Sequence, residues 1–408
     1  MAGPAKFDWL IVIHRYVGLM LGLWLFAVGL SGAILAYYRE IDVALNPHLF
    51  TPTGADNPQH PDLDAMLASV RAAYPDRFVL SLDRYALSRD ETYPFILSAP
   101  LPRTAAGLDL SSIGNYEAAA DLQVFVDPAT AAVVGARSYW TWINWLRDFH
   151  RELFLPGAGG RNILGVLGAL TFASVVIGSF LWWRDARKHP RRAFVIRPSA
   201  PPPRLIRDAH TVLGIYAALV IGWLSLSAAL ICYETPLRNL ADRLLRPEHV
   251  AQNFQTLVAQ ADHSAPPTAD GIVSLNAARD LALTDHPNSE VVLIRMPKSA
   301  AARFSFRLYP TDQDVTIYTR QVYIDAGTGR IVGRFDPARQ PWTDSLFGVW
   351  LIWFHNGTML GDAGRALNIA AGLILASLFP TGVYIWWKKR RTRLPRRTIA
   401  PGLAQPAE

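Results

Sequence analysis

The chain has 408 residues, of which 51% are hydrophobic and 18% charged, and its mean hydropathy is positive. This composition excludes a disordered or collagen-like chain and argues against a soluble protein of this size. A net charge of +7 would suit a nucleic-acid-binding protein, but membrane proteins also collect lysine and arginine in their cytoplasmic loops. The single cysteine, Cys232, excludes an intramolecular disulfide, and the sequence lacks the C-x-x-C-H motif of covalently attached haem.

Four apolar stretches without a charged residue or histidine are long enough to be membrane spans, since a helix needs about 20 such residues to cross the hydrocarbon. They comprise residues 16–38, 162–183, 211–233 and 366–387. The first is longer than the apolar core of a signal peptide and no A-x-A-like cleavage site follows it, so we expect it to be retained.

The basic residues around these spans predict the orientation of the chain. Between residues 184 and 207 there are eight lysines and arginines and one acidic residue, and between residues 388 and 397 there are seven basic residues and no acidic one. The positive-inside rule places both segments, and hence both termini, in the cytoplasm. The long segments after the first and third spans are then external, and the basic surplus needs no nucleic-acid partner.

The sequence contains an internal repeat. His14 to Gly18 (HRYVG) match residues 210–214 (HTVLG), and QVFVD at 123–127 matches QVYID at 321–325. Phe149-His150 matches Phe354-His355, Gly160-Arg161 matches Gly364-Arg365, and GSFLWWR at 178–184 matches GVYIWWK at 382–388. Each half comprises a span, an external domain, a short aromatic helix and a second span. Because both halves enter from the cytoplasm, we expect parallel repeats with a pseudo-twofold axis along the membrane normal.

The external domains share a pattern of one helix followed by antiparallel strands. In the first, we expect a helix at 63–74 and strands at 78–85, 93–98 and 122–127; in the second, a helix at 271–283 and strands at 291–296, 304–309 and 316–325. Turn residues at 127–130 and 325–329 separate the last two strands of each domain. Residues 140–155 predict an interfacial aromatic helix, because this segment carries too many charged residues to span a membrane, and residues 342–360 are its counterpart in the second half.

Four of the ten histidines recur in both halves: His14 matches His210, and His150 matches His355. The two histidines of one half lie on opposite sides of the membrane and cannot share a cofactor. Across the pseudo-twofold axis, however, His14 faces His210 and His150 faces His355. This arrangement predicts two b-type haems, each held by two axial imidazoles. Six histidines have no counterpart: His48, His60, His189, His249, His263 and His286.

Residues around the matched histidines are compatible with this interpretation. Small residues follow His14 and His210 on one helical face, and either leave room for a flat macrocycle or serve close helix packing; they are Gly18, Gly22, Gly29, Gly214, Ala218 and Gly222. Four arginines are candidate partners for haem propionates, with phospholipid headgroups as the alternative; they are Arg147, Arg151, Arg161 and Arg365.

Motifs for other chemistry are absent from the sequence. It contains no P-loop, no dinucleotide fingerprint, no H-E-x-x-H and no G-x-S-x-G, and its Cys and His spacing does not suit structural zinc. Without a flavin or nicotinamide domain on the chain, electrons must come from a separate, unidentified donor in the cytoplasm or the membrane.

The motif IHRYVG at 13–18, the exit motifs WWR and WWK, and the order of span, α+β domain and span resemble the PepSY-associated transmembrane helix family. The doubled four-span form is similar to bacterial inner-membrane siderophore reductases of the ferrioxamine type. This resemblance implies that His14, His210, His150 and His355 are the axial ligands of two haems. Electrons would pass by outer-sphere transfer to a ferric siderophore docked between the two external domains, where reduction weakens chelation and releases iron. No proton-transferring catalytic residue is required.

Two alternatives remain at this stage. The external domains could be PepSY binding or protease-modulating modules that the spans merely anchor, or the haems could serve a quinol or a periplasmic redox protein. The predicted fold class is a membrane α-helical protein with four transmembrane helices in two parallel pseudo-twofold repeats, each with an external α+β PepSY-like domain. The expected segments are helix 1 (1–38), external domain 1 (39–139), interfacial helix (140–161), helix 2 (162–183), cytoplasmic loop (184–209), helix 3 (210–233), external domain 2 (234–341), interfacial helix (342–365), helix 4 (366–387) and cytoplasmic tail (388–408).

Overall fold

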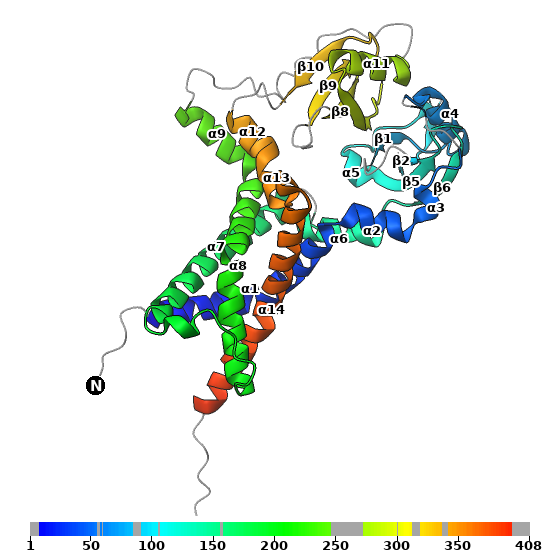
Figure 1. Cartoon of the computed structure of the whole chain (residues 1–408). Helices are drawn as coiled ribbons and strands as arrows, with labels where there is room; N and C mark the ends of the chain where they lie inside the picture. Colours follow the sequence, from blue (N-terminus) through cyan, green and yellow to red (C-terminus); the bar gives the residue numbers. More distant parts are fainter. Residues whose placement is uncertain are drawn as a thin grey trace, which may run out of the picture. The chain divides into compact units, whose positions relative to one another are not determined.

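The computed structural model describes residues 8–54, 58, 60–84, 91–104, 107–155, 158–245, 272–299, 301–311, 319–336 and 342–393 (Figure 1). The chain divides into two compact units. We call residues 1–33, 166–226 and 367–408 the helical unit, and residues 34–165 and 227–366 the sheet unit.

Four long helices have the length and composition of membrane spans: α1 (Asp8–Leu35), α7 (Ala158–Ala186), α8 (Pro202–Cys232) and α14 (Gly361–Arg393). They confirm the four expected spans and a multi-pass membrane protein. Each helix is longer than its charge-free stretch, because charged residues at the ends continue the helix beyond the apolar run. As a result, His14 and His210 lie within α1 and α8 rather than ahead of them.

Helix packing in the helical unit relies on small residues. A Cβ built on Gly29 of α1 would lie 2.6 Å from the Gly372 carbonyl oxygen of α14, so the two backbones are in direct contact. Helix α8 packs on α14 through Ala217, Ile221 and Ala371. A short 3-10 helix, η1 (Pro190–Arg192), lies in the basic loop between α7 and α8.

The sheet unit is built on one eight-stranded antiparallel sheet, in the order β10-β9-β8-β7-β1-β2-β5-β6. The strands are β1 (Val79–Asp83), β2 (Tyr93–Ser98), β5 (Ala120–Val126), β6 (Val133–Ser138), β7 (Ser289–Arg295), β8 (Arg303–Pro310), β9 (Arg320–Asp325) and β10 (Ile331–Phe335). A separate small ribbon pairs β3 (Arg103–Thr104) with β4 (Gly107–Leu108).

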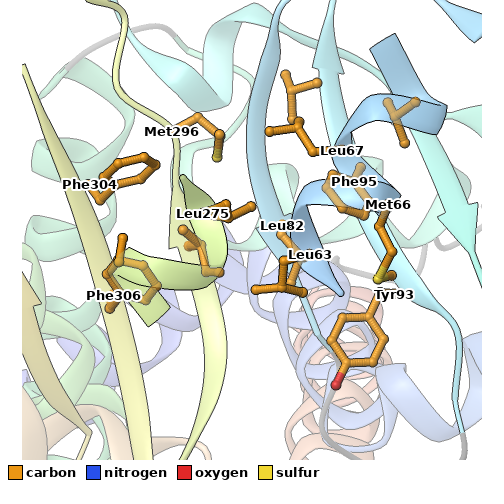
Figure 2. Close-up of a cluster of buried hydrophobic side chains, with 14 of the residues drawn as sticks. Leu63, Met66, Leu67, Leu82, Tyr93, Phe95, Leu275, Met296, Phe304 and Phe306 are labelled. Carbon is orange, nitrogen blue, oxygen red and sulfur yellow. The ribbon is translucent and has the colours of Figure 1, made fainter. Parts of the chain in front are cut away.

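Helices α4 (Leu63–Ala73) and α11 (Leu275–Asp285) cover one face of this sheet. Figure 2 shows Met66 and Leu275 from these helices among Phe95, Phe304 and Phe306 from the strands. All five side chains are at most 1% exposed, so both halves of the sequence contribute to one hydrophobic core. The amphipathic strand pattern fits this arrangement, since alternate residues of β8 are buried.

The two expected external domains are not separate bodies. Strands β1 and β7 pair antiparallel, with Leu82 opposite Ile294, and this pairing joins four strands from each half into one sheet. Each half does contain the expected helix and antiparallel strands. The space between the halves is therefore hydrogen-bonded sheet and apolar core.

Shorter elements complete the sheet unit. The helices are α2 (Tyr38–Leu45), α3 (Pro47–Phe50), α5 (Tyr116–Ala119), α6 (Trp142–Glu152), α9 (Glu234–Leu245), α12 (Trp342–Ser345), a π-helix η4 (Leu346–Trp350), α13 (Leu351–His355) and a 3-10 helix η5 (Thr358–Leu360). Arg137 of β6 fixes α2 to the sheet through two 2.6 Å hydrogen bonds to the buried carboxylate of Asp42.

The structure agrees closely with most of the predicted elements. The expected helix at 63–74 is α4, and the expected strand at 93–98 is β2. The interfacial helix at 140–155 is α6, whereas residues 342–360 form several short helical turns instead of one helix. Residues 271 and 316–318, at the edges of two expected elements, lie outside the described residues.

Candidate functional site

His14 lies in the second turn of α1 and contacts α7. Its Nδ1 is 3.0 Å from the carbonyl oxygen of Ser174 and 3.1 Å from the Ser174 hydroxyl. A carbonyl oxygen can only accept a hydrogen bond, so this contact favours the tautomer with the proton on Nδ1. The Nε2 lone pair is then available to bind a metal.

His210 of α8 makes a similar contact with α14. Its Nδ1 is 2.9 Å from the Thr381 hydroxyl, which also lies 2.8 Å from the Ser377 carbonyl oxygen. The single hydroxyl proton goes to the carbonyl, so Thr381 accepts a hydrogen bond from His210 Nδ1. The backbone of Leu378 also hydrogen-bonds this imidazole. His210 therefore also presents Nε2 for binding a metal.

A glycine lies against each of these imidazoles. A Cβ built on Gly178 would be 2.9 Å from Cε1 of His14, and one built on Gly382 would be 3.5 Å from Cε1 of His210. Both glycines follow the carbonyl-bearing residue, Ser174 or Leu378, by four residues, which is about one helical turn.

The small residues that follow the two histidines fall into two groups. Gly18 follows His14 by four residues, and a Cβ built on Gly18 would have no atom within 4 Å. Gly214 follows His210 by four residues, and a Cβ built there would contact only a methyl group of Leu378, at 3.8 Å. Further along α1, Gly22 instead accommodates the Phe379 ring. Space beside a macrocycle is thus available one turn after each histidine, while the later glycines serve helix packing.

The second pair, His150 and His355, belongs to the sheet unit. His355 is the last residue of α13, and its Nδ1 is 2.9 Å from the Ser227 hydroxyl. Burial, together with the nearby charges of His355 and Arg151, lowers the pKa of His150 to about 4. His150 is therefore neutral at physiological pH, as a metal-ligating imidazole must be.

Two features beside this second pair are typical of functional sites. The π-helix η4 directly precedes α13, which ends at His355, and such a distortion often marks functional sites. Its last residue, Trp350, buries an indole Nε1 without a hydrogen-bond partner among the described residues. A buried donor of this kind can satisfy an acceptor on a bound group, such as a propionate. Sequence reasoning missed Trp350, because no repeat match involves it.

The aromatic residues of α6 and of the turn that follows it form an exposed apolar surface. Trp142, Trp145 and Phe154 are about half exposed, and the Trp145 and Phe154 rings meet edge to face with centroids 5.4 Å apart. Such surfaces suit the membrane interface, where indole rings lie at headgroup level. The expectation of an interfacial aromatic helix fits this exposure.

The four candidate arginines have different surroundings. Arg365 pairs with Glu40 and stacks on Tyr37 at 3.6 Å, and so already has protein partners. Arg147 donates to the Tyr139 hydroxyl at 3.0 Å. Arg151 and Arg161 are exposed, and Arg161 donates to the Ile231 carbonyl at 3.3 Å.

The unmatched histidines lie elsewhere. His48, His60 and His189 are exposed, and His286 is 3.4 Å from Asp285 at the end of α11. His249 and His263 are outside the described residues. Within the described part of the chain, no three His, Cys, Asp or Glu side chains converge as a metal held by protein alone would need. A haem iron needs only two axial side chains, because the porphyrin supplies the other ligands.

Comparison with known families matches the profile described as PepSY-associated TM region to residues 11–389. This match covers both halves of the sequence and all four long helices. A comparison with curated protein sequences finds no match.

Proposed function

The chain belongs to the PepSY-associated TM family, and from this premise we propose that it is an inner-membrane oxidoreductase that holds two b-type haems and passes electrons outward to a ferric siderophore. The two halves would be parallel repeats about a pseudo-twofold axis, each with a PepSY-like half of the sheet. The basic segments at 184–207 and 388–397 support a cytoplasmic location for both termini.

One observation carries the proposal. In both halves the first-span histidine turns Nδ1 toward a backbone or hydroxyl oxygen of the second span and has a glycine against its ring. Helix packing alone does not require a histidine at this place in both halves. Fixing Nδ1 in this way orients the ring and raises the basicity of Nε2, which is how proteins prepare an imidazole to bind a metal.

The residues that would hold the cofactors follow from this geometry. His14 and His210 would ligate one haem and His150 and His355 the other. Ser174, Thr381 and Ser227 would orient three of these rings, and Trp350 and Arg147 would supply donors on the external side. When bound, haem supplies reversible one-electron transfer within a dry protein environment.

The chain itself would contribute binding and orientation rather than acid-base chemistry. Reduction of Fe(III) to Fe(II) in the chelate consumes one electron per iron, and no bond to the protein forms or breaks. The donor must be another protein or a membrane-soluble carrier, since the sequence lacks a flavin or nicotinamide motif.

Reoxidation of the reduced protein tests the proposal. The purified chain is reduced anaerobically with dithionite, and a ferric siderophore is added while the haem bands are followed. We expect reoxidation in the wild type and its loss in His150→Ala and His355→Ala, even where the other haem is retained. Rapid oxidation by a quinone analogue but not by ferric chelates would instead identify a quinol-linked cytochrome. A chain without any haem band would support the anchored PepSY module.

A further inference from the structure

The two faces of the eight-stranded sheet differ in composition. One face carries the core beneath α4 and α11. On the opposite face, the first half of the sheet is covered by apolar clusters that include Leu80, Ile96 and Phe125. The second half of that same face is instead polar and half-exposed, and it is rich in arginine.

Strand register places these polar residues side by side. Ser81 of β1 lies opposite Arg295 of β7, which lies opposite Ser305 of β8, which lies opposite Tyr323 of β9. Directly opposite residues share a face of a sheet, with Cβ atoms about 5 Å apart. These four residues therefore form one row across the sheet.

The adjacent row extends the same surface. Asp83 lies opposite Leu293, Leu293 opposite Arg307, and Arg307 opposite Gln321. Arg295 and Arg307 are thus diagonal neighbours on adjacent strands. Arg303 lies two residues before Ser305 on β8, and its guanidinium lies over the Tyr323 ring, 5.4 Å from the centroid.

Charges on this surface are strongly unbalanced. Asp83 interacts electrostatically with four arginines, namely Arg39 of α2, Arg147 of α6, Arg295 and Arg307. The Tyr323 hydroxyl interacts with Arg295, Arg303 and Arg307. Five arginines thus gather near Asp83, and two further acids lie among them, since Asp325 is opposite Arg303 and Glu91 interacts electrostatically with Arg39. We call this surface, made of Asp83, Tyr323 and the five arginines, the arginine face.

The arginines of this face differ in their neighbours. Arg39 donates to the Tyr38 hydroxyl at 2.9 Å, and Glu91 also acts on it electrostatically. Within the part of the chain that the structure describes, Arg295 and Arg307 form no ion pair within 4 Å. Arg295 is exposed and Arg307 is half-buried. Two guanidinium groups so placed can bind a carboxylate or another planar anion with paired hydrogen bonds.

The arginine face adjoins the helix that carries His150. Arg147 is part of the arginine face because it interacts electrostatically with Asp83. It lies three residues before His150 on α6. Residues three apart are neighbours on the surface of a helix. An anion held by the arginine face would therefore lie near the external histidine pair.

We propose that the arginine face is the docking site for the electron acceptor, and that this acceptor is a ferric chelate with net negative charge. Charge complementarity selects the occupant, since among the described residues the five arginines outnumber Asp83, Glu91 and Asp325, and this excess favours an anion over a neutral or cationic chelate. The tyrosine and arginine planes suit carboxylate or catecholate donor groups. The role as acceptor site rests on the proposed function, whereas anion binding does not.

Binding of a redox-inert analogue tests this inference without electron transfer. Titration calorimetry on the oxidised full-length protein uses gallium(III) citrate as the anionic probe and a cationic gallium hydroxamate as its counterpart. We expect the anionic probe to bind about tenfold more tightly or better, with an affinity that falls as salt increases. Arg295→Gln/Arg307→Gln should lose about tenfold or more, since charge-assisted hydrogen bonds are lost.

Matched variants separate the effect from misfolding. Arg295→Lys/Arg307→Lys keeps the charge and should retain part of the affinity, and Arg103→Gln, at an exposed arginine on β3, should bind like the wild type. Unaltered binding by the double Gln variant, tight binding of the cationic chelate, or displacement of the probe by short-chain phosphatidylglycerol would overturn the proposal. If the anionic probe binds but ferric chelates do not reoxidise the haems, the proposed function alone is refuted. If an anionic ferric chelate reoxidises the haems equally well in the wild type and in the double Gln variant, the arginine face alone is refuted.

Discussion

Replacing Gly178 with alanine should weaken haem binding at the His14 and His210 pair. The added methyl group would lie 2.9 Å from Cε1 of His14, closer than carbon atoms normally approach. Either the imidazole or helix α7 must move. Inserting a methyl group into a packed site costs about 1–3 kcal/mol, and such a loss corresponds to about 5- to 150-fold in affinity.

Two other glycines provide graded controls. The corresponding distance for Gly382 and His210 is 3.5 Å, an ordinary contact, so Gly382→Ala should cost less than about tenfold. A Cβ built on Gly222 would make only ordinary contacts, the nearest with a Val175 methyl at 3.6 Å, and Gly222→Ala should bind haem like the wild type.

Haem titration of the apoprotein measures these affinities through the Soret band, with the other site removed by His150→Ala/His355→Ala in every variant. The expected order of affinity is wild type, Gly382→Ala and then Gly178→Ala. If Gly178→Ala binds haem as tightly as the wild type, the contact between Gly178 and His14 does not belong to the haem site.

Three further predictions concern the ligands, the topology and a buried carboxylate. His14→Ala or His210→Ala should remove one haem and His150→Ala or His355→Ala the other, while His48→Ala and His286→Ala keep both spectra; loss of haem in the last two would contradict the assignment. A phosphatase fused near residue 260 should be active and one fused after Arg397 inactive, and the reverse would invert the electron path. Asp127 accepts hydrogen bonds from Thr53 and Gly54, which outweigh burial and hold the pKa of Asp127 below its usual range. Asp127→Asn should therefore lower the free energy of unfolding by about 1–3 kcal/mol at pH 7. Because the folded pKa is depressed, this difference should shrink as the pH falls below about 4, and a difference independent of pH would refute the role of the charge.

Much of the fold could be predicted from local sequence patterns. The spans, the helix α4 and strand β2 follow from apolar runs and periodicity, which are properties of neighbouring residues. The single sheet could not be predicted in this way, because β1 and β7 are about two hundred residues apart and their pairing leaves no local signal. The broken helix at 342–360 includes a π-helical turn that periodicity does not reveal.

The candidate site was only partly predictable. The repeat identified the histidines and matched Gly178 with Gly382, but it could not identify the oxygens that accept from Nδ1. Ser174 of the first half corresponds to Leu378 of the second. The side chains of the two residues differ, because each residue contacts its histidine through the backbone carbonyl. The alternation of Arg303, Ser305 and Arg307 with buried Phe304 and Phe306 was a readable sign of the arginine face.

Haem content tests the central claim most directly. A pyridine haemochrome assay on the purified full-length protein should give about two b-type haems per chain, one for each matched histidine pair. The oxidised protein should also show the low-spin spectrum of iron with two axial imidazoles. A value near one haem per chain would mean that only one histidine pair binds haem. If protein from cells supplemented with haem contains no haem, the account is contradicted.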